Sequence, residues 1–111
     1  MYLAGSESLA ILEILAHTNT STIIGSYSLF SIEINDQHII ELANPFLPSD
    51  WQDYPAPPST ALIGEQWLAS NQNPILSLPS TIVVRERNYL LNVNHHVSPG
   101  IVSAAIEMPF R

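Results

Sequence analysis

The acid Glu13 stands inside an otherwise apolar stretch, "SLAILEILAH", over residues 8–17. Burying an unpaired charge is costly, so a carboxylate in this company needs either water or a polar cavity. On a helix its neighbours lie three and four residues away: Ala10 and Ala16 are small and leave room beside it, and His17 is a weak partner. Two interpretations stay open: Glu13 lines a cleft walled by the helix, or it marks the solvent side of an amphipathic helix.

Other residue types that carry chemistry form no complete site in the sequence. There are no cysteines, and no set of ligands with metal-binding spacing can be assembled from the four histidines, His17, His38, His95 and His96. We therefore expect no metal. No "GxSxG" elbow is present, and the four glycines lie too far apart to form a phosphate loop. Asn88 and Asn92 in "NYLLN" are either turn and capping residues, or amides that hydrogen-bond a ligand or a structural loop.

The charge balance restricts the class of partner. Three arginines and no lysines face ten acids, which gives a net charge of −7. A nucleic-acid groove needs several cations in one patch, so the composition excludes direct nucleic-acid binding. The apolar runs are shorter than the roughly 18 residues of a membrane helix, and the N-terminus lacks the basic start of a secretory signal. We expect a cytoplasmic protein without a membrane partner.

The elements that must position Glu13 begin at the N-terminus of the chain. The patterns predict a strand over residues 1–4, then a helix capped by Ser6 or Ser8 that ends near His17. Apolar alternation predicts a hairpin within residues 22–42, with its turn at residues 35–37.

The second half of the chain reads as a loop, a helix and further strands. Five prolines predict an ordered, extended loop over residues 44–60, followed by a helix over residues 60–70. Residues 74–84 predict one or two buried strands broken at Pro79. Residues 85–100 are predicted to be rich in turns, and residues 101–108 are predicted to form a last strand. This order predicts an α+β domain, and 111 residues with 46% hydrophobic content predict a single core.

Three stretches, in order, resemble one known family. "MYLAGSESLAILEILAH" resembles the tyrosine-bearing strand and glutamate-bearing helix of RES-domain proteins. "DWQDYPAPPSTALIGEQWLAS" is similar to their proline-rich loop and Gly-x-x-Trp helix, and "ILSLPSTIVVRERNYLLNVNHH" to their Pro-Ser strand and Asn-x-x-x-Asn segment. The stretches span nearly the whole chain, so the resemblance implies one RES-like domain over residues 1–111, shortened at both ends relative to the family pattern.

The resemblance implies a fold and an activity. RES domains have a mixed sheet with a few packed helices, similar to ADP-ribosyltransferases, and are the toxins of Xre-RES toxin–antitoxin modules in bacteria. They consume NAD+ by cleaving the nicotinamide–ribose bond, through hydrolysis or phosphorolysis, and ADP-ribosyl transfer has also been attributed to them. The implied partner is an Xre-type antitoxin, and a homodimer is a second expected association.

Carried over residue by residue, the resemblance assigns a site. Glu13 matches the catalytic glutamate, Tyr2 the strand tyrosine and Ser80 the serine of the Pro-Ser strand. Glu13 and Tyr2 are the expected catalytic residues, and all three are expected to contact NAD+.

The chain also departs from the family pattern. The arginine that the family carries before its tyrosine has no counterpart here, and this implies weaker binding of the NAD+ pyrophosphate. The alternative is therefore a catalytically inactive remnant that only binds the antitoxin. A third hypothesis, from outside the family, is a small β-rich module that binds an unrelated protein, and it predicts Glu13 far from Tyr2 and Ser80.

Overall fold

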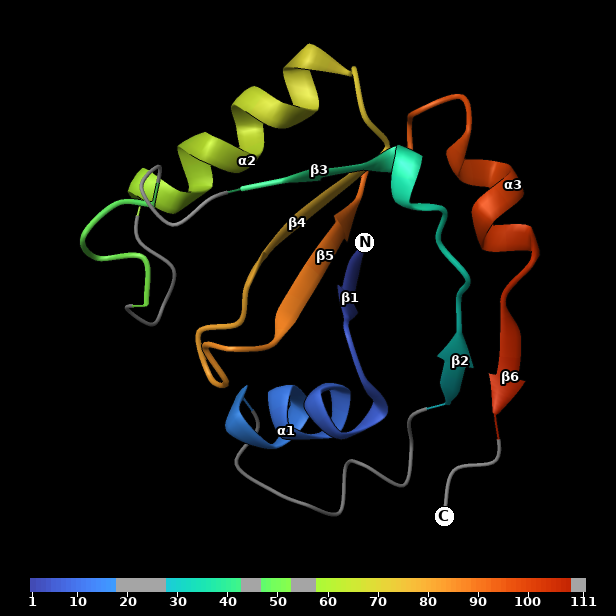
Figure 1. The fold of residues 1–111 in the computed structure, drawn as a ribbon, viewed down its shortest axis with the longest axis horizontal. Coiled ribbons are helices and arrows are strands. Elements are labelled where there is room, and N and C mark those ends of the chain that lie inside the picture. Colours follow the sequence, from blue (N-terminus) through green and yellow to red (C-terminus); the bar gives the residue numbers. More distant parts are fainter. Residues whose placement is uncertain (18–27, 43–46, 53–57, 109–111) are drawn as a thin grey trace.

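A computed structural model describes residues 1–17, 28–42, 47–52 and 58–108. Its centre is a four-stranded mixed sheet in the order β1-β5-β4-β3 (Figure 1). The strands are β1 (Tyr2–Ala4), β5 (Arg87–Leu91), β4 (Ile75–Pro79) and β3 (Ile39–Glu41). β5 runs antiparallel to both β1 and β4, while β3 is parallel to β4. β1, at the start of the chain, therefore lies beside β5, although the two strands are far apart in sequence.

A two-stranded ribbon stands beside this sheet. It pairs β2 (Leu29–Ser31) antiparallel to β6 (Ile106–Met108), and it lies at the right of Figure 1 below helix α3 (Ser98–Ser103). A short 3₁₀ helix, η2 (Asp36–His38), precedes β3.

The two longer helices follow the expected signals. Helix α1 (Glu7–His17) begins after Ser6, whose Oγ accepts a hydrogen bond from the Leu9 N–H at 3.1 Å, as an N-cap does. Helix α2 (Pro58–Ser70) begins two residues earlier than expected because Pro58 fits the first turn. Inside α2, the Ser59 hydroxyl donates to Asp50 at 2.7 Å and ties the helix to the segment before it.

The core lies where α1 meets the middle of the sheet. Leu9 of α1 and Ile75 of β4 are fully buried, and Leu76 and Leu91 are nearly so. β4 has neighbours on both edges, and four of its five residues are buried. The break expected at Pro79 is confirmed, since β4 ends there.

The hairpin expected within residues 22–42 is wrong for the residues that the structure describes. β2 and β3 both form, but β2 pairs with β6 and β3 with β4. Alternation indicates that a segment is a strand, but it does not choose the partner. The expected turn does form, as η2, with the Asn35 side chain accepting from the Gln37 N–H at 3.1 Å. Residues 22–27 lie outside the described residues, as do 43–46 and 53–57 of the proline-rich stretch.

Two expectations for the C-terminal third are also corrected. Residues 87–91, predicted as turn-rich, form the inner strand β5, with turns just before it at residues 84–85 and again after Asn92. The last strand starts at Ile106, because Pro99 sits in the first turn of α3 and favours a helix there. Within the described ranges, no helix has the length and apolar character needed to cross a bilayer.

Candidate active site

Glu13 points from α1 toward the ends of β4 and β5 and is half-buried. Its Oε1 accepts two hydrogen bonds, from Ser80 Oγ at 2.9 Å and from Asn88 Nδ2 at 2.8 Å. No partner for Oε2 occurs in the part of the chain that the structure describes. The acid is therefore neither an ordinary surface residue nor an unpaired buried charge. The pairing expected between Glu13 and His17 lies outside the residues whose side chains are described.

Ser80 directly follows β4 and is fully buried. Its Oγ accepts hydrogen bonds from the backbone N–H groups of Ile82 and Val83, each at 3.1 Å. A hydroxyl has one proton to donate, and here it goes to Glu13. Ser80 thus fixes both the carboxylate and the turn that follows β4.

Asn88 on β5 joins Glu13 to Tyr2. It is only 1% exposed and lies in register between Ala4 of β1 and Leu78 of β4. Its Nδ2 donates to the Tyr2 hydroxyl as well as to Glu13. Its Oδ1 is buried and has no hydrogen-bond partner among the described residues.

Tyr2 on β1 has a perturbed phenol. Partial burial, followed by the Glu13 carboxylate, raises its pKa from 10.0 to about 12, and the hydrogen bond from Asn88 opposes this rise. The residue as a whole is 55% exposed, so its ring remains accessible while its hydroxyl belongs to the network. The phenol therefore keeps its proton at neutral pH.

A close backbone contact at Gly5 positions the segment between Tyr2 and Glu13. The Gly5 N–H donates to the Arg87 carbonyl at 2.9 Å, and a Cβ on Gly5 would lie 2.8 Å from that oxygen. The Ser6 hydroxyl then donates to Glu86 at 2.9 Å. These contacts hold the start of α1 against β5, and so bring Glu13 above Asn88.

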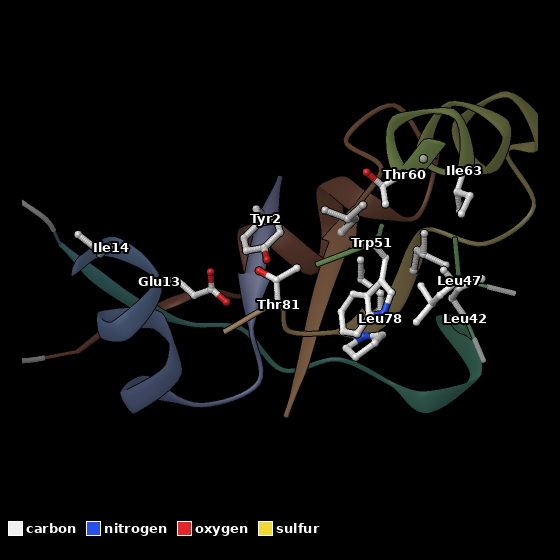
Figure 2. A pocket seen from close by; sticks show the side chains of 14 residues that line it. Tyr2, Glu13, Ile14, Leu42, Leu47, Trp51, Thr60, Ile63, Leu78 and Thr81 are labelled. Atoms are coloured by element: carbon white, nitrogen blue, oxygen red, sulfur yellow. The ribbon is translucent and has the colours of Figure 1, made fainter. Parts of the chain in front are cut away.

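The network opens into a cavity of about 490 Å³. Figure 2 shows Tyr2, Glu13 and Thr81 turned toward one another at one end. The rest of the wall is mainly apolar, and comes from the sheet, from α2 and from the segment before it: Leu42, Leu47, Trp51, Ile63, Leu76, Leu78, Pro79 and Leu90. One carboxylate and one phenol facing an apolar wall is the composition of a small-molecule site.

A second hollow, of about 910 Å³, lies between the β1–α1 segment and β2. Tyr2 borders both hollows, but Glu13 lines only the smaller one. The smaller cavity, which Glu13 and Tyr2 both line, is therefore the candidate site.

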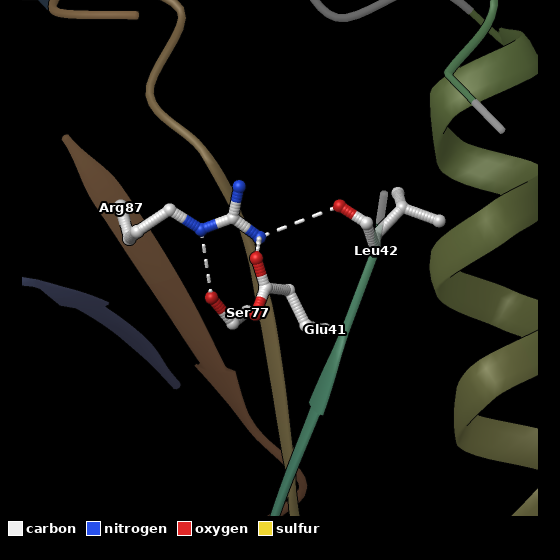
Figure 3. Close-up of polar contacts among 4 residues, drawn as sticks. All are labelled: Glu41, Leu42, Ser77 and Arg87. Carbon is white, nitrogen blue, oxygen red and sulfur yellow. Dashed lines mark hydrogen bonds and ion pairs between the residues drawn. The ribbon is translucent and has the colours of Figure 1, made fainter. Parts of the chain in front are cut away.

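Arg87 lies on the other face of the sheet, because it alternates with Asn88 along β5. Its Nε donates to Ser77 Oγ at 2.9 Å, and its Nη2 donates to the Leu42 carbonyl at 3.3 Å and lies 3.6 Å from Glu41 (Figure 3). Arg87 is thus engaged in bracing β3, β4 and β5. Among the described residues that line the cavity there is no arginine.

The structure brings together all three residues expected from the sequence, Tyr2, Glu13 and Ser80. The third hypothesis, which required them to be scattered, does not fit this arrangement. Asn88 was missed as a site residue. Its signal was the pair of asparagines in "NYLLN", but the sequence did not indicate which of the two belongs to the site. Asn92 has a structural role: it donates to Asn71 at 3.0 Å and accepts from the Asn94 N–H at 3.1 Å. Within the described ranges, no group of three or more His, Cys, Asp or Glu residues is placed to hold a metal ion.

Comparison with known proteins gives consistent results. The family model for the RES domain matches residues 1–111. A "Toxin Res" of Yersinia enterocolitica is 44% identical over 110 residues, which are 99% of this chain and 72% of that protein. A "Toxin Res" of Photorhabdus laumondii is 38% identical over 93 residues, 83% of this chain and 59% of that protein.

A third relative carries an activity in its name. The "Prs ADP-ribosylating toxin" of a Sphingobium species is 36% identical over 104 residues, which are 91% of this chain and 65% of that protein. The chain thus spans between about three-fifths and three-quarters of the length of these relatives. The mixed sheet with packed helices is the α+β, ADP-ribosyltransferase-like architecture expected from the sequence. The match over its whole length shows that this chain belongs to the RES domain family.

Proposed function

We propose that this chain is the toxin of a bacterial toxin–antitoxin module and that it consumes NAD+ by cleaving the nicotinamide–ribose bond. The main support for this proposal is the geometry of Glu13. Its carboxylate is held at a cavity wall by Ser80 and Asn88, and Asn88 also joins it to Tyr2. The name of the Sphingobium relative, an ADP-ribosylating toxin, supports NAD+ as the substrate.

The proposed chemistry needs a fixed negative charge. When the glycosidic bond of NAD+ breaks, the ribose develops oxocarbenium character, and a nearby carboxylate stabilises that charge or orients the attacking oxygen. The two hydrogen bonds to Oε1 hold the carboxylate in place, so it does not have to move when positive charge develops on the ribose. The reaction releases nicotinamide, and the acceptor is water, phosphate or a protein side chain.

Tyr2 and Ser80 have separate proposed tasks. Tyr2 keeps its proton, so it contacts NAD+ as a hydrogen-bond donor to the ribose, while its exposed ring can stack on nicotinamide. Ser80 remains a proposed residue of the NAD+ site, and its hydrogen bonds favour a role through Glu13 and the following turn. The apolar wall near Trp51 suits a flat heterocycle of the dinucleotide.

The proposed partner is an Xre-type antitoxin that covers the cavity, with a homodimer as a second association and the cytoplasm as the place of action. The lack of an arginine among the described lining residues gives the alternative some support. In that alternative the chain is an inactive remnant, and it binds the antitoxin without consuming NAD+.

The test is nicotinamide release from NAD+ by the purified chain, followed by liquid chromatography, with water and then phosphate as the acceptor. Release by the chain and by Glu65→Ala, but not by Glu13→Ala, supports the proposal. Glu65 is the matched control because it is an exposed acid on α2. Equal rates in all three would reject Glu13 as catalytic, while antitoxin binding without any release would favour the inactive remnant.

A further inference from the structure

We propose that Asn88 is a positioning residue that directs the Tyr2 proton toward the substrate and leaves one oxygen of Glu13 to act on the ribose. This inference rests on the proposed function, because it assigns the atoms that would carry out the same reaction.

The first step is the orientation of the Asn88 amide. An ionised carboxylate only accepts hydrogen bonds, so the NH₂ end of the amide must face Glu13. That end has two protons, and both are used, one toward Glu13 Oε1 at 2.8 Å and one toward the Tyr2 oxygen. The Tyr2 oxygen therefore acts as an acceptor inside the network. Its own proton is left to point elsewhere, and Tyr2 lines the cavity.

The second step concerns the two oxygens of Glu13. Ser80 and Asn88 both donate to Oε1. Oε2 has no such donor within the described residues, although Glu13 lines the cavity. The amide thus helps to fix Oε1 and leaves Oε2 available, and Oε2 is the atom that contacts the ribose or the acceptor.

The third step is the unused end of the amide. Asn88 Oδ1 is buried and unpartnered among the described residues, in register between Ala4 and Leu78. A buried acceptor without a partner destabilises the fold, so an apolar residue would serve packing better at this position. The useful part of Asn88 is its donor end, and what that end contacts is Glu13 and Tyr2. This distinguishes a positioning role from a purely structural one.

The test is a double-mutant cycle on nicotinamide release. We expect Asn88→Leu to lower kcat about 30-fold with little change in KM, because it removes both donors. In a Glu13→Gln background the same substitution should lower kcat less than about threefold, because the residues act as a unit. Circular dichroism and urea unfolding establish that each variant is folded. Equal losses in both backgrounds would show that Asn88 acts only through stability, and would overturn the inference.

A conservative variant gives a second readout. In Asn88→Asp an acidic side chain donates only when protonated, so activity should recover partly between about pH 7.5 and pH 5. Asn92→Asp is the matched control, since Asn92 is also buried but donates a hydrogen bond to Asn71 instead of Glu13. It should keep the pH profile of the unsubstituted chain. A flat profile for Asn88→Asp, or the same recovery in Asn92→Asp, would contradict the inference.

A third readout does not depend on turnover. The side-chain amide signals of Asn88 in a ¹⁵N spectrum should shift in both Glu13→Gln and Tyr2→Phe, and stay in place in Glu65→Gln. Absence of either shift would overturn the inference even in an active enzyme. If the chain releases no nicotinamide at all, the proposed function fails, and this spectrum still decides whether Asn88 positions both residues.

Discussion

The side-chain amide of Asn88 lies 2.8 Å from the Glu13 carboxylate, although 75 residues separate them in the chain. This contact joins the first helix to the central strand of the sheet. It also explains the acid in "SLAILEILAH", because two neutral donors, Ser80 and Asn88, pair with Glu13 at a cavity. The chemistry of the site therefore depends on the packing of β1, α1, β4 and β5 together.

Substitution of Ser80 should affect stability and activity together. Ser80→Ala leaves the N–H groups of Ile82 and Val83 without their acceptor and takes one donor from Glu13. We expect a loss of about 1–3 kcal/mol in the free energy of unfolding, and a fall in kcat of about tenfold. Urea unfolding and nicotinamide release measure the two effects. Ser103→Ala, at an exposed serine of α3, is the control, and a Ser80→Ala variant that matches it in both assays would contradict this role.

The pH dependence of Tyr2 follows from its pKa, which is raised from 10.0 to about 12. The folded state favours the protonated phenol, so this contribution to stability is fully present below pH 10 and is lost as the pH rises toward about 12. Tyr2→Phe should lower the rate of nicotinamide release without changing the shape of the pH–rate profile between about pH 7 and 9. If the unsubstituted chain instead shows a rise in rate with pH in that range, and this rise is lost in Tyr2→Phe, the phenol titrates there and acts as a base, which would contradict the prediction.

A pair of glycine substitutions tests the path from β1 to α1. In Gly5→Ala the new Cβ would meet the Arg87 carbonyl at 2.8 Å, so the backbone must shift and the network with it. In Gly100→Ala, within α3, the new Cβ would meet no atom within 4 Å apart from its chain neighbours and the backbone of its own helix, and the helix should gain about 0.5–1 kcal/mol. Thermal unfolding should therefore move in opposite directions for the two variants. Equal melting temperatures would contradict the close approach at Gly5.

Arg87 should matter for stability and not for substrate affinity. Arg87→Gln removes the contacts to Ser77, Leu42 and Glu41 on the face of the sheet away from the cavity. We expect a lower free energy of unfolding, by about 1 kcal/mol, with KM for NAD+ within about twofold of the unsubstituted chain. A large rise in KM with unchanged unfolding would instead place Arg87 on the pyrophosphate.

Local signals predicted the parts of the site that lie close together in sequence. Glu13 stood out because a charge in an apolar helix needs a partner. Ser6 and Ser8 were both predicted as possible caps of that helix, and the structure shows Ser6 as the cap. The break at Pro79 was also visible, because proline cannot continue the hydrogen bonding of a central strand.

The non-local parts could not be predicted from the same signals. β3 pairs with β4 across α2, and β2 with β6, and nothing in the alternation of Phe30 and Ile32 selects those partners. β5 was hidden because Asn88 and Arg87 resemble turn or surface residues. Their polar groups face Glu13 on one side of the sheet and Ser77 on the other, and both partners become neighbours only in the folded chain.

The most direct measurement is the steady-state rate of nicotinamide release by Glu13→Gln, which keeps the shape of the side chain and removes its charge. We expect kcat to fall at least about 100-fold while KM for NAD+ changes less than about threefold, because the charge is needed mainly in the transition state. A Glu13→Gln variant that releases nicotinamide as fast as the unsubstituted chain would contradict this expectation.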